Sequence, residues 1–88
     1  MKPVEKPIRL SQHARQQVAY RGTTEAEVLE AIRTVAWRPA EGDRLETRKE
    51  FAYKQVRSGR QYQTKQVRPI FVEESSELVV VTVYVYYF

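Results

Sequence analysis

The stretch LVVVTVYVYYF, residues 78–88, decides the fold of this chain. Every second side chain from Val79 to Val85 is a valine, and the positions between them, Val80 to Tyr86, include Thr82 and Tyr84. Alternation of this kind is typical of a β-strand with one face in the core and the other at least partly wet. We therefore expect a strand here whose valine face, Val79 to Val85, meets the rest of the core.

Two further strands are predicted on the N-terminal side of this one. They are Leu45–Val56 and Gln61–Val72, and Ser58-Gly59 supplies the turn between them. Pro69 cannot donate to a strand ladder, which suits an edge strand or a bulge. Near the N-terminus, Ile8–Leu10 could form a brief edge strand.

Two helices are predicted between these strands. Ser11 is a good N-cap for a helix over Gln12–Arg21, and Gly22 can supply its left-handed C-cap. Thr24 and Glu27 have the spacing of a capping box, which predicts a second helix over Glu25–Ala36. The order of elements predicts an α+β fold in a single domain, residues 1–88, with two N-terminal helices packed on a three- to four-stranded antiparallel sheet.

Composition excludes several classes of site. The chain has no cysteine, so it can form neither a disulfide nor a thiolate metal site, and its single histidine leaves too few ligands for structural zinc. We expect no metal and no cofactor. No apolar run reaches the roughly 18 residues of a membrane span, and the N-terminus has no apolar core of a signal peptide. A cysteine-free chain of this size is typical of the cytoplasm, so we expect a cytoplasmic protein with no membrane partner.

The charge of the chain is unevenly distributed. The formal net charge is +4, but residues 48–68 alone hold seven lysines and arginines against one acid, Glu50. A basic segment of this kind attracts phosphates, and interleaved Tyr53 and Tyr62 could stack on bases. The predicted phosphate ligands are Arg21, Lys54, Arg57, Arg60, Lys65 and Arg68. Two alternatives stay open: the strand cations only keep a hairpin edge unpaired, and Arg21 only satisfies the last carbonyls of its helix.

His13 and Tyr84 are the candidate catalytic residues. Histidine is the commonest general acid or base at neutral pH, and a tyrosine beside a basic cluster can orient or activate a ribose hydroxyl. The competing interpretation is that His13 bonds the backbone at the start of its helix and Tyr84 is an ordinary residue of an amphipathic sheet. The sequence has no carboxylate pair, nucleophile elbow or glycine-rich phosphate loop.

Three segments of the N-terminal half together form a recognisable sequence pattern. They are Ile8–Ala14, Arg21-Gly22-Thr23 and Glu27–Ile32, and the final strand, Val79–Tyr84, adds to them. These segments resemble the DUF4258 family. The chain departs from the family pattern at Gln17, where the family has arginine, and at Thr23, where it has isoleucine.

The resemblance implies a plan similar to that of RelE-like and BrnT-like toxins, small ribonucleases that cleave RNA without metal. It therefore implies an RNA-interacting protein, for which an endoribonuclease toxin of a toxin–antitoxin pair is the leading hypothesis. A non-catalytic nucleic-acid-binding module and a protein-interaction domain are the alternatives, and the missing cation at Gln17 favours both. The expected partners are RNA, including ribosome-bound mRNA, and an acidic antitoxin-like protein. An exposed tyrosine face is also compatible with a homodimer.

Overall fold

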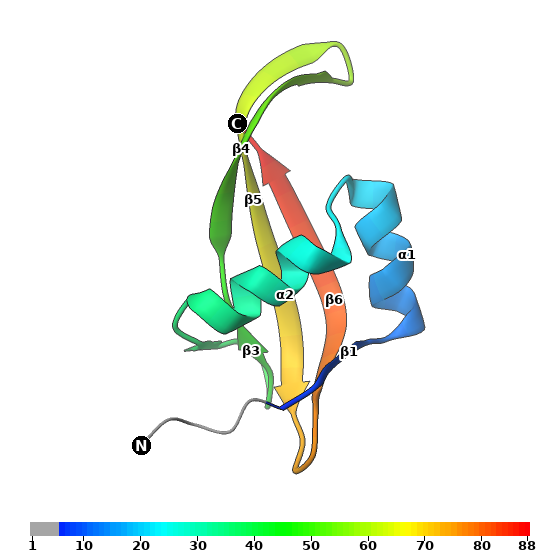
Figure 1. Ribbon diagram of the computed structural model, residues 1–88, viewed down its shortest axis with the longest axis vertical. Coiled ribbons are helices and arrows are strands. Elements are labelled where there is room, and N and C mark those ends of the chain that lie inside the picture. Colours follow the sequence, from blue (N-terminus) through cyan, green and yellow to red (C-terminus); the bar gives the residue numbers. More distant parts are fainter. Residues whose placement is uncertain (1–5) are drawn as a thin grey trace.

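Two long strands form the middle of the molecule in the computed structural model, which describes residues 6–88 (Figure 1). The expectation about a signal peptide concerns a segment that lies mostly outside these residues. The elements in chain order are β1 (Ile8–Leu10), α1 (Gln12–Arg21), α2 (Glu25–Thr34), β2 (Arg38–Pro39), β3 (Leu45–Glu46), β4 (Lys49–Arg57), β5 (Arg60–Glu73) and β6 (Leu78–Tyr87).

The predicted fold class is wrong in its sheet. The two helices are present, but the strands form one six-stranded mixed sheet in the order β1-β6-β5-β3-β2, with β4 also on β5, rather than a three- to four-stranded antiparallel sheet. The parallel pair is β1 with β6, from Ile8 opposite Leu78 to Leu10 opposite Val80. The expected edge strand Ile8–Leu10 is present as β1, whereas β2 and β3 are two residues long, too short to show any periodicity in the sequence.

The helices follow their capping signals. Helix α1 has the predicted bounds: the Ser11 hydroxyl accepts a hydrogen bond from the Ala14 N–H, and Gly22 ends the helix with φ of 82°. Helix α2 begins as predicted but ends at Thr34, two residues before the predicted Ala36. The indole N–H of Trp37 donates to the Ile32 carbonyl at 2.9 Å and satisfies a carbonyl of the last turn. None of the helices in residues 6–88 is long and apolar enough to cross a membrane.

Pro69 explains why the predicted strand Leu45–Val56 is divided into β3 and β4. Strand β5 runs unbroken through Pro69, and its partner on one side changes there from β3, which pairs as far as Ile70, to β4, which begins opposite Val67. A proline has no N–H for the ladder, so Thr47 and Arg48 opposite it form no regular strand pair, and the Thr47 N–H donates to the Pro69 carbonyl at 3.4 Å. The predicted Leu45–Val56 is therefore β3 and β4, separated at this gap.

The predicted valine face of β6 is only half right. Opposite β5, Thr82 pairs with Ile70 and Val80 pairs with Phe71, so Val81 is an extra residue that forms a β-bulge. The bulge reverses the alternation, so the core side of β6 carries Leu78 and Val80 before it and Val83 and Val85 after it.

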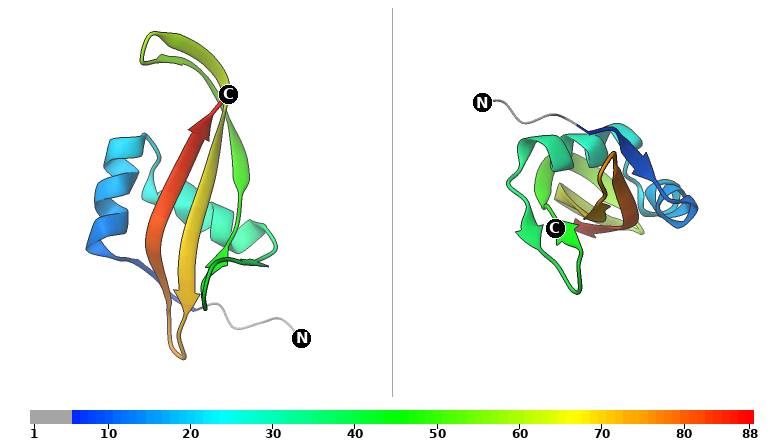
Figure 2. Two further views of the ribbon diagram at one scale, coloured as in Figure 1. Left: turned by 180° about the vertical axis from the view of Figure 1, so that it is seen from behind. Right: turned by 90° about the horizontal axis from the view of Figure 1, so that it is seen from below.

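The helices cover one face of the sheet and leave the other uncovered. Figure 2 (left) shows β6 and β5 in front, with α2 behind them and α1 beside β6. The core lies between the helices and the sheet; its members are Leu10, Ala14, Val28, Ile32, Val67, Phe71, Leu78, Val80 and Val83. At one end β4 and β5 continue beyond the end of β6 as a curved hairpin (Figure 1). We call this projecting part, residues 54–63, the hairpin arm.

Candidate nucleic-acid interface

The hairpin arm is shaped by three residues with positive φ. Lys54 has φ of 54° at a bulge where the pairing shifts from Ala52 opposite Thr64 to Gln55 opposite Tyr62. Ser58 and Gly59, with φ of 53° and 77°, form the predicted two-residue turn. The bulge bends the arm toward the side of the sheet that carries the helices (Figure 1). The arm therefore projects from the body of the molecule and curves over the end of α1.

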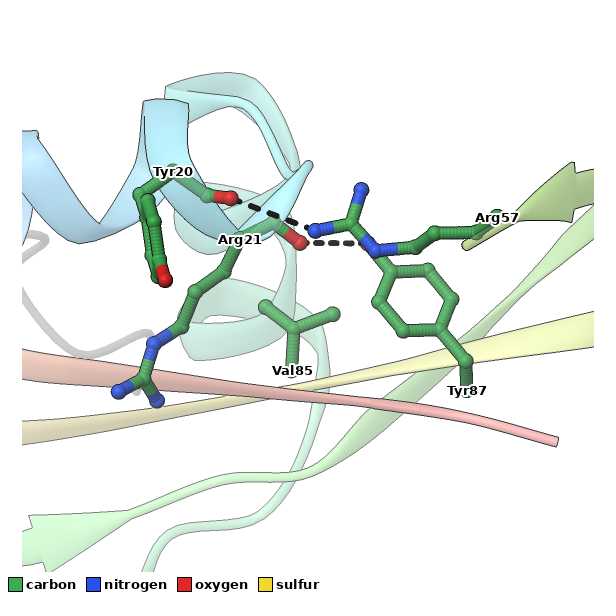
Figure 3. Close-up of a pocket in the computed structure, with 5 residues that line it drawn as sticks. All are labelled: Tyr20, Arg21, Arg57, Val85 and Tyr87. Atoms are coloured by element: carbon green, nitrogen blue, oxygen red, sulfur yellow. Dashed lines mark hydrogen bonds between the residues drawn. The ribbon is translucent and has the colours of Figure 1, made fainter. Parts of the chain in front are cut away.

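Arg57 at the end of β4 contacts the C-terminus of α1 (Figure 3). Its Nη2 donates to the Tyr20 carbonyl at 3.3 Å, and its guanidinium lies 4.7 Å from the centre of the Tyr87 ring. The Tyr87 hydroxyl donates to the Arg21 carbonyl. The last carbonyls of a helix carry partial negative charge, so a cation and a hydroxyl donor stabilise this helix end. Arg57 thus stabilises the fold with part of its guanidinium.

Lys65 is buried, and its ammonium group is paired within the fold. Its side chain is 8% exposed, and its Nζ lies 2.8 Å from a Glu27 carboxylate oxygen and donates to the Gly22 carbonyl at 3.1 Å. Burial raises the pKa of Glu27, but hydrogen bonds from Lys65 and Thr23 lower it by more, so its pKa lies below the ordinary value. The charge of Lys65 is neutralised where it lies, so this predicted phosphate ligand is occupied by contacts within the fold.

A pocket of about 510 Å³ opens beside these contacts, between the end of α1 and β6. Figure 3 shows that the Arg21 guanidinium points away from Arg57, while Tyr87 reaches up to the helix end. Burial raises the pKa of Tyr87, so its hydroxyl stays protonated at neutral pH and acts as a donor rather than a base. Because backbone carbonyls of α1 face this site, it is a helix-capping arrangement and a poor place for an anion. The lining residues are Tyr20, Arg21, Arg57, Val85 and Tyr87.

Arg68 belongs to the uncovered face of the sheet, where it holds Glu46. Its Nε and Nη2 donate to one carboxylate oxygen of Glu46 at 3.0 and 2.6 Å, and Arg48 donates to the other oxygen at 3.0 Å. Glu46 is only 5% exposed, and hydrogen bonds from Arg68, together with Arg48, hold its pKa below the ordinary value despite its burial. Two arginines thus share one carboxylate, which leaves this cluster with a single net positive charge.

The two predicted catalytic residues are not brought together. Tyr84 lies on the uncovered face between two guanidiniums, those of Arg21 at 5.3 Å and Arg68 at 5.4 Å from the ring centre. His13 is exposed on α1, makes no side-chain hydrogen bond or ion pair within residues 6–88, and lines neither the pocket of Figure 3 nor the groove beside Tyr84. Their catalytic roles stay predictions.

Gln17 has a role that the sequence did not reveal. Its Oε1 accepts hydrogen bonds from the Thr82 hydroxyl and the Val83 N–H, both at 2.7 Å, and Arg21 donates to the Val83 carbonyl at 3.3 Å. These two side chains of α1 bond the backbone of β6 beyond the point where β1 stops pairing with it. Only the four-residue spacing of Gln17 and Arg21 on one helix face could have suggested a shared role.

Lys54 and Arg60 are the predicted ligands that keep their charge exposed. Both are on the hairpin arm, and neither has a hydrogen-bonding or ionic partner in the part of the chain that the structure describes. With Arg57 they make three cations on the arm, and no acid occurs anywhere from Phe51 to Val72. The same part of the chain holds no group of three His, Cys, Asp or Glu side chains that could bind a metal ion.

The predicted phosphate ligands therefore divide into three places. Lys54, Arg57 and Arg60 are on the arm, Lys65 is buried beneath the helices, and Arg21 and Arg68 flank Tyr84 on the uncovered face. The resemblance to the DUF4258 family stays a prediction from the sequence. No family model, curated protein or solved structure matches this chain.

Proposed function

We propose that this protein binds RNA and that the hairpin arm provides its main contacts with phosphate. The observation that carries the proposal is the arm itself, a projecting ribbon with cations at Lys54, Arg57 and Arg60 and no acid within it. Cations without carboxylate partners bind phosphates by releasing counterions from the nucleic acid. An arm that stands away from the body can approach a phosphate backbone without a clash from the helices.

The polar residues of the arm fit the same proposal. Gln55, Gln61 and Gln63 alternate with the cations along both strands, and all three side chains are exposed. Their amides can donate to phosphate and sugar oxygens, which make up half or more of the hydrogen bonds in such interfaces. Arg57 uses one N–H on the Tyr20 carbonyl, which leaves its other donors available to a ligand.

Binding is favoured over cleavage. Cleavage without metal needs a base and a cation that face the same phosphate. The polar groups of the arm are amides, guanidiniums, an amine, the Ser58 hydroxyl and the Tyr62 phenol, whose ring packs against Tyr87 with ring centres 5.8 Å apart; Tyr87 beside the arm is a donor with a raised pKa. The non-catalytic module is therefore the better hypothesis, and the same cations would also attract the acidic antitoxin-like partner expected from the sequence.

The test measures the affinity for a labelled single-stranded RNA of about 15 nucleotides at low salt. Changing Lys54 and Arg60 together to glutamine keeps side-chain length and removes two charges; we expect affinity to fall about tenfold. The control changes Arg9 and Arg15 to glutamine, because these exposed cations belong to β1 and α1 and lie outside the arm, with Arg9 paired to Glu77. Equal loss in the two double variants would overturn the assignment of the arm, and no RNA binding by the unmodified protein would overturn the proposal.

The same reactions are followed for cleavage. The binding proposal expects the RNA to remain intact over hours at neutral pH. Cleavage by the unmodified protein that is lost in Tyr84→Phe or His13→Gln would instead restore the nuclease hypothesis.

A further inference from the structure

The uncovered face of the sheet carries an exposed aromatic pair that the hairpin arm does not use. Tyr84 and Tyr86 project from β6 on this face, and they are 36% and 44% exposed. Their cross-strand neighbours on β5 are Arg68 and Gln66. No helix lies over this part of the sheet (Figure 2, left). Two tyrosines and an arginine therefore form an open surface of planar groups on a rigid support.

Hydrogen bonds and stacking fix the orientation of these planar groups. The Tyr86 hydroxyl accepts a hydrogen bond from Arg68 Nη1 at 3.3 Å, which draws the ring across the sheet toward β5. Arg68 is itself held by Glu46 with two short hydrogen bonds. The rings and the guanidinium are thus ordered before any ligand arrives, so binding costs little side-chain entropy.

Two cations without carboxylate partners among residues 6–88 lie near Tyr84. Arg21 reaches around the edge of β6, where its guanidinium donates to the Val83 carbonyl and lies over the Tyr84 ring. Arg44, from the loop before β3, has no ion-pair partner within residues 6–88 and lines a groove of about 140 Å³ with Tyr84 and Arg68. The groove also contains Glu41, so its charge is mixed, with the arginines in excess.

We infer that this face binds unpaired nucleotides, with a base stacked against Tyr86 and phosphates held by Arg21 and Arg44, while the Tyr84 ring holds the guanidiniums of Arg21 and Arg68 in place. Stacking on aromatic rings and on guanidinium planes is how proteins hold single-stranded RNA, because paired bases do not expose their faces. The inference deepens the proposed function: the arm supplies contacts with phosphate, and this face selects single strands over duplexes.

A second copy of this chain is the other occupant that an aromatic face could take. Symmetric pairing of this face would bring Arg21 and Arg44 of one copy toward the same cations of the other. Like charges at close range are unfavourable, and phosphates are attracted by the same groups. The distribution of charge therefore favours RNA over a homodimer here.

The test compares a single-stranded RNA with a duplex of the same sequence. In the variant Tyr84→Val with Tyr86→Val, which keeps a strand-forming residue at both sites, we expect affinity for the single strand to fall at least about tenfold. Affinity for the duplex should change less than about twofold. The control is Tyr20→Val, since this tyrosine is 82% exposed on α1 and away from the face.

Four further outcomes decide the inference. Tyr84→Phe with Tyr86→Phe keeps both rings and should keep the affinity for the single strand. Ultraviolet crosslinking of thiouridine-containing RNA should label Tyr84 or Tyr86 in the unmodified protein. The crosslink does not depend on whether the valine variant folds. Equal losses for single strand and duplex, or no loss at all, would overturn the inference. A dimer that sedimentation detects in the unmodified protein and not in the valine variant would overturn the inference, because the face would then be a dimer interface.

These results separate the inference from the proposed function. If the variant of Lys54 and Arg60 weakens binding to both RNAs while the tyrosine variant changes nothing, the arm stands and the inference fails. If the tyrosine variant alone weakens binding, the face stands and the proposed role of the arm fails.

Discussion

Replacing Lys65 by methionine should destabilise the protein without reducing its affinity for RNA. Methionine has a similar length and an apolar side chain, so it can fill the buried site. The change removes two contacts of Nζ, the ion pair with Glu27 at 2.8 Å and the hydrogen bond to the Gly22 carbonyl at 3.1 Å. It also leaves the Glu27 carboxylate with only the Thr23 hydroxyl as a side-chain donor among residues 6–88.

The magnitude follows from the burial of the two partners. Removing one partner of a fully buried pair costs about 3–5 kcal/mol. The Glu27 side chain is 25% exposed, so water can solvate part of its charge, and we expect the unfolding free energy to fall by about 2 kcal/mol. In a domain of this size that corresponds to a melting temperature lower by roughly 8–16 °C.

The assay is thermal and urea unfolding, followed by circular dichroism, of four proteins. They are the unmodified chain, Lys65→Met, Glu27→Gln and the double variant, which together form a double-mutant cycle. The double variant should recover part of the loss, because no carboxylate is then left without its cation. RNA affinity, measured well below the melting temperature, should stay within about twofold. A stable Lys65→Met protein that binds RNA tenfold more weakly would refute the reasoning, because Lys65 would then be a phosphate ligand and not a buried ion pair.

Three further changes test other contacts. Gly22→Ala should cost more than the roughly 1 kcal/mol of a left-handed alanine, since its Cβ would lie 2.5 Å from the Tyr87 hydroxyl and 2.8 Å from Arg57 Nη1; an unchanged melting temperature would contradict this. Hydrogen bonds, first from Arg68, lower the pKa of Glu46 in the folded protein. Its contribution to stability is therefore complete above the unfolded pKa near 4.5 and is lost as pH falls through the folded pKa. Glu46→Gln should make unfolding free energy depend less on pH in the acid range, and an unchanged dependence would exclude this role. The pKa of Tyr87 is raised, so its contribution is complete below the unfolded value near 10.0 and is lost as pH rises through the folded value; Tyr87→Phe should unfold with a shallower alkaline limb than the unmodified protein.

The helices and turns could be predicted because their signals are local. Ser11, Gly22 and Thr24 each act within one helical turn of themselves, and Ser58-Gly59 has the residue types that a two-residue hairpin requires. Each of these predictions depends only on neighbours in the sequence. They were therefore independent of how the sheet was assembled.

The sheet could not be predicted in full because its decisive features depend on distant partners. The pairing of Ile8–Leu10 with β6 joins the two ends of the chain, and nothing in a three-residue segment indicates parallel pairing. The bulge at Val81 is concealed by an unbroken run of strand-forming residues, so simple alternation placed the wrong valines in the core. Pro69 was correctly associated with an irregularity, but the irregularity is in the strand opposite it.

The same limit applies to the cations. The sequence shows that residues 48–68 are basic, but it does not show which side chains turn toward the helices. Lys65 faces α2 and meets a carboxylate there, whereas Arg60, five residues earlier, is on the arm and exposed. The tertiary positions of Glu27 on α2 and Glu46 on β3 separate the cations that hold the fold from the cations that remain available to a ligand.

The salt dependence of RNA binding tests this separation most directly. The slope of log affinity against log salt counts the phosphates neutralised, at about 0.7 for each contact with a single strand. Changing Lys54 and Arg60 together to glutamine should make the slope shallower by about 1.4, with an unchanged melting temperature, while Lys65→Met should lower the melting temperature and leave the slope as it was. A slope that is unchanged in the arm variant, or that becomes shallower in Lys65→Met, would contradict the account.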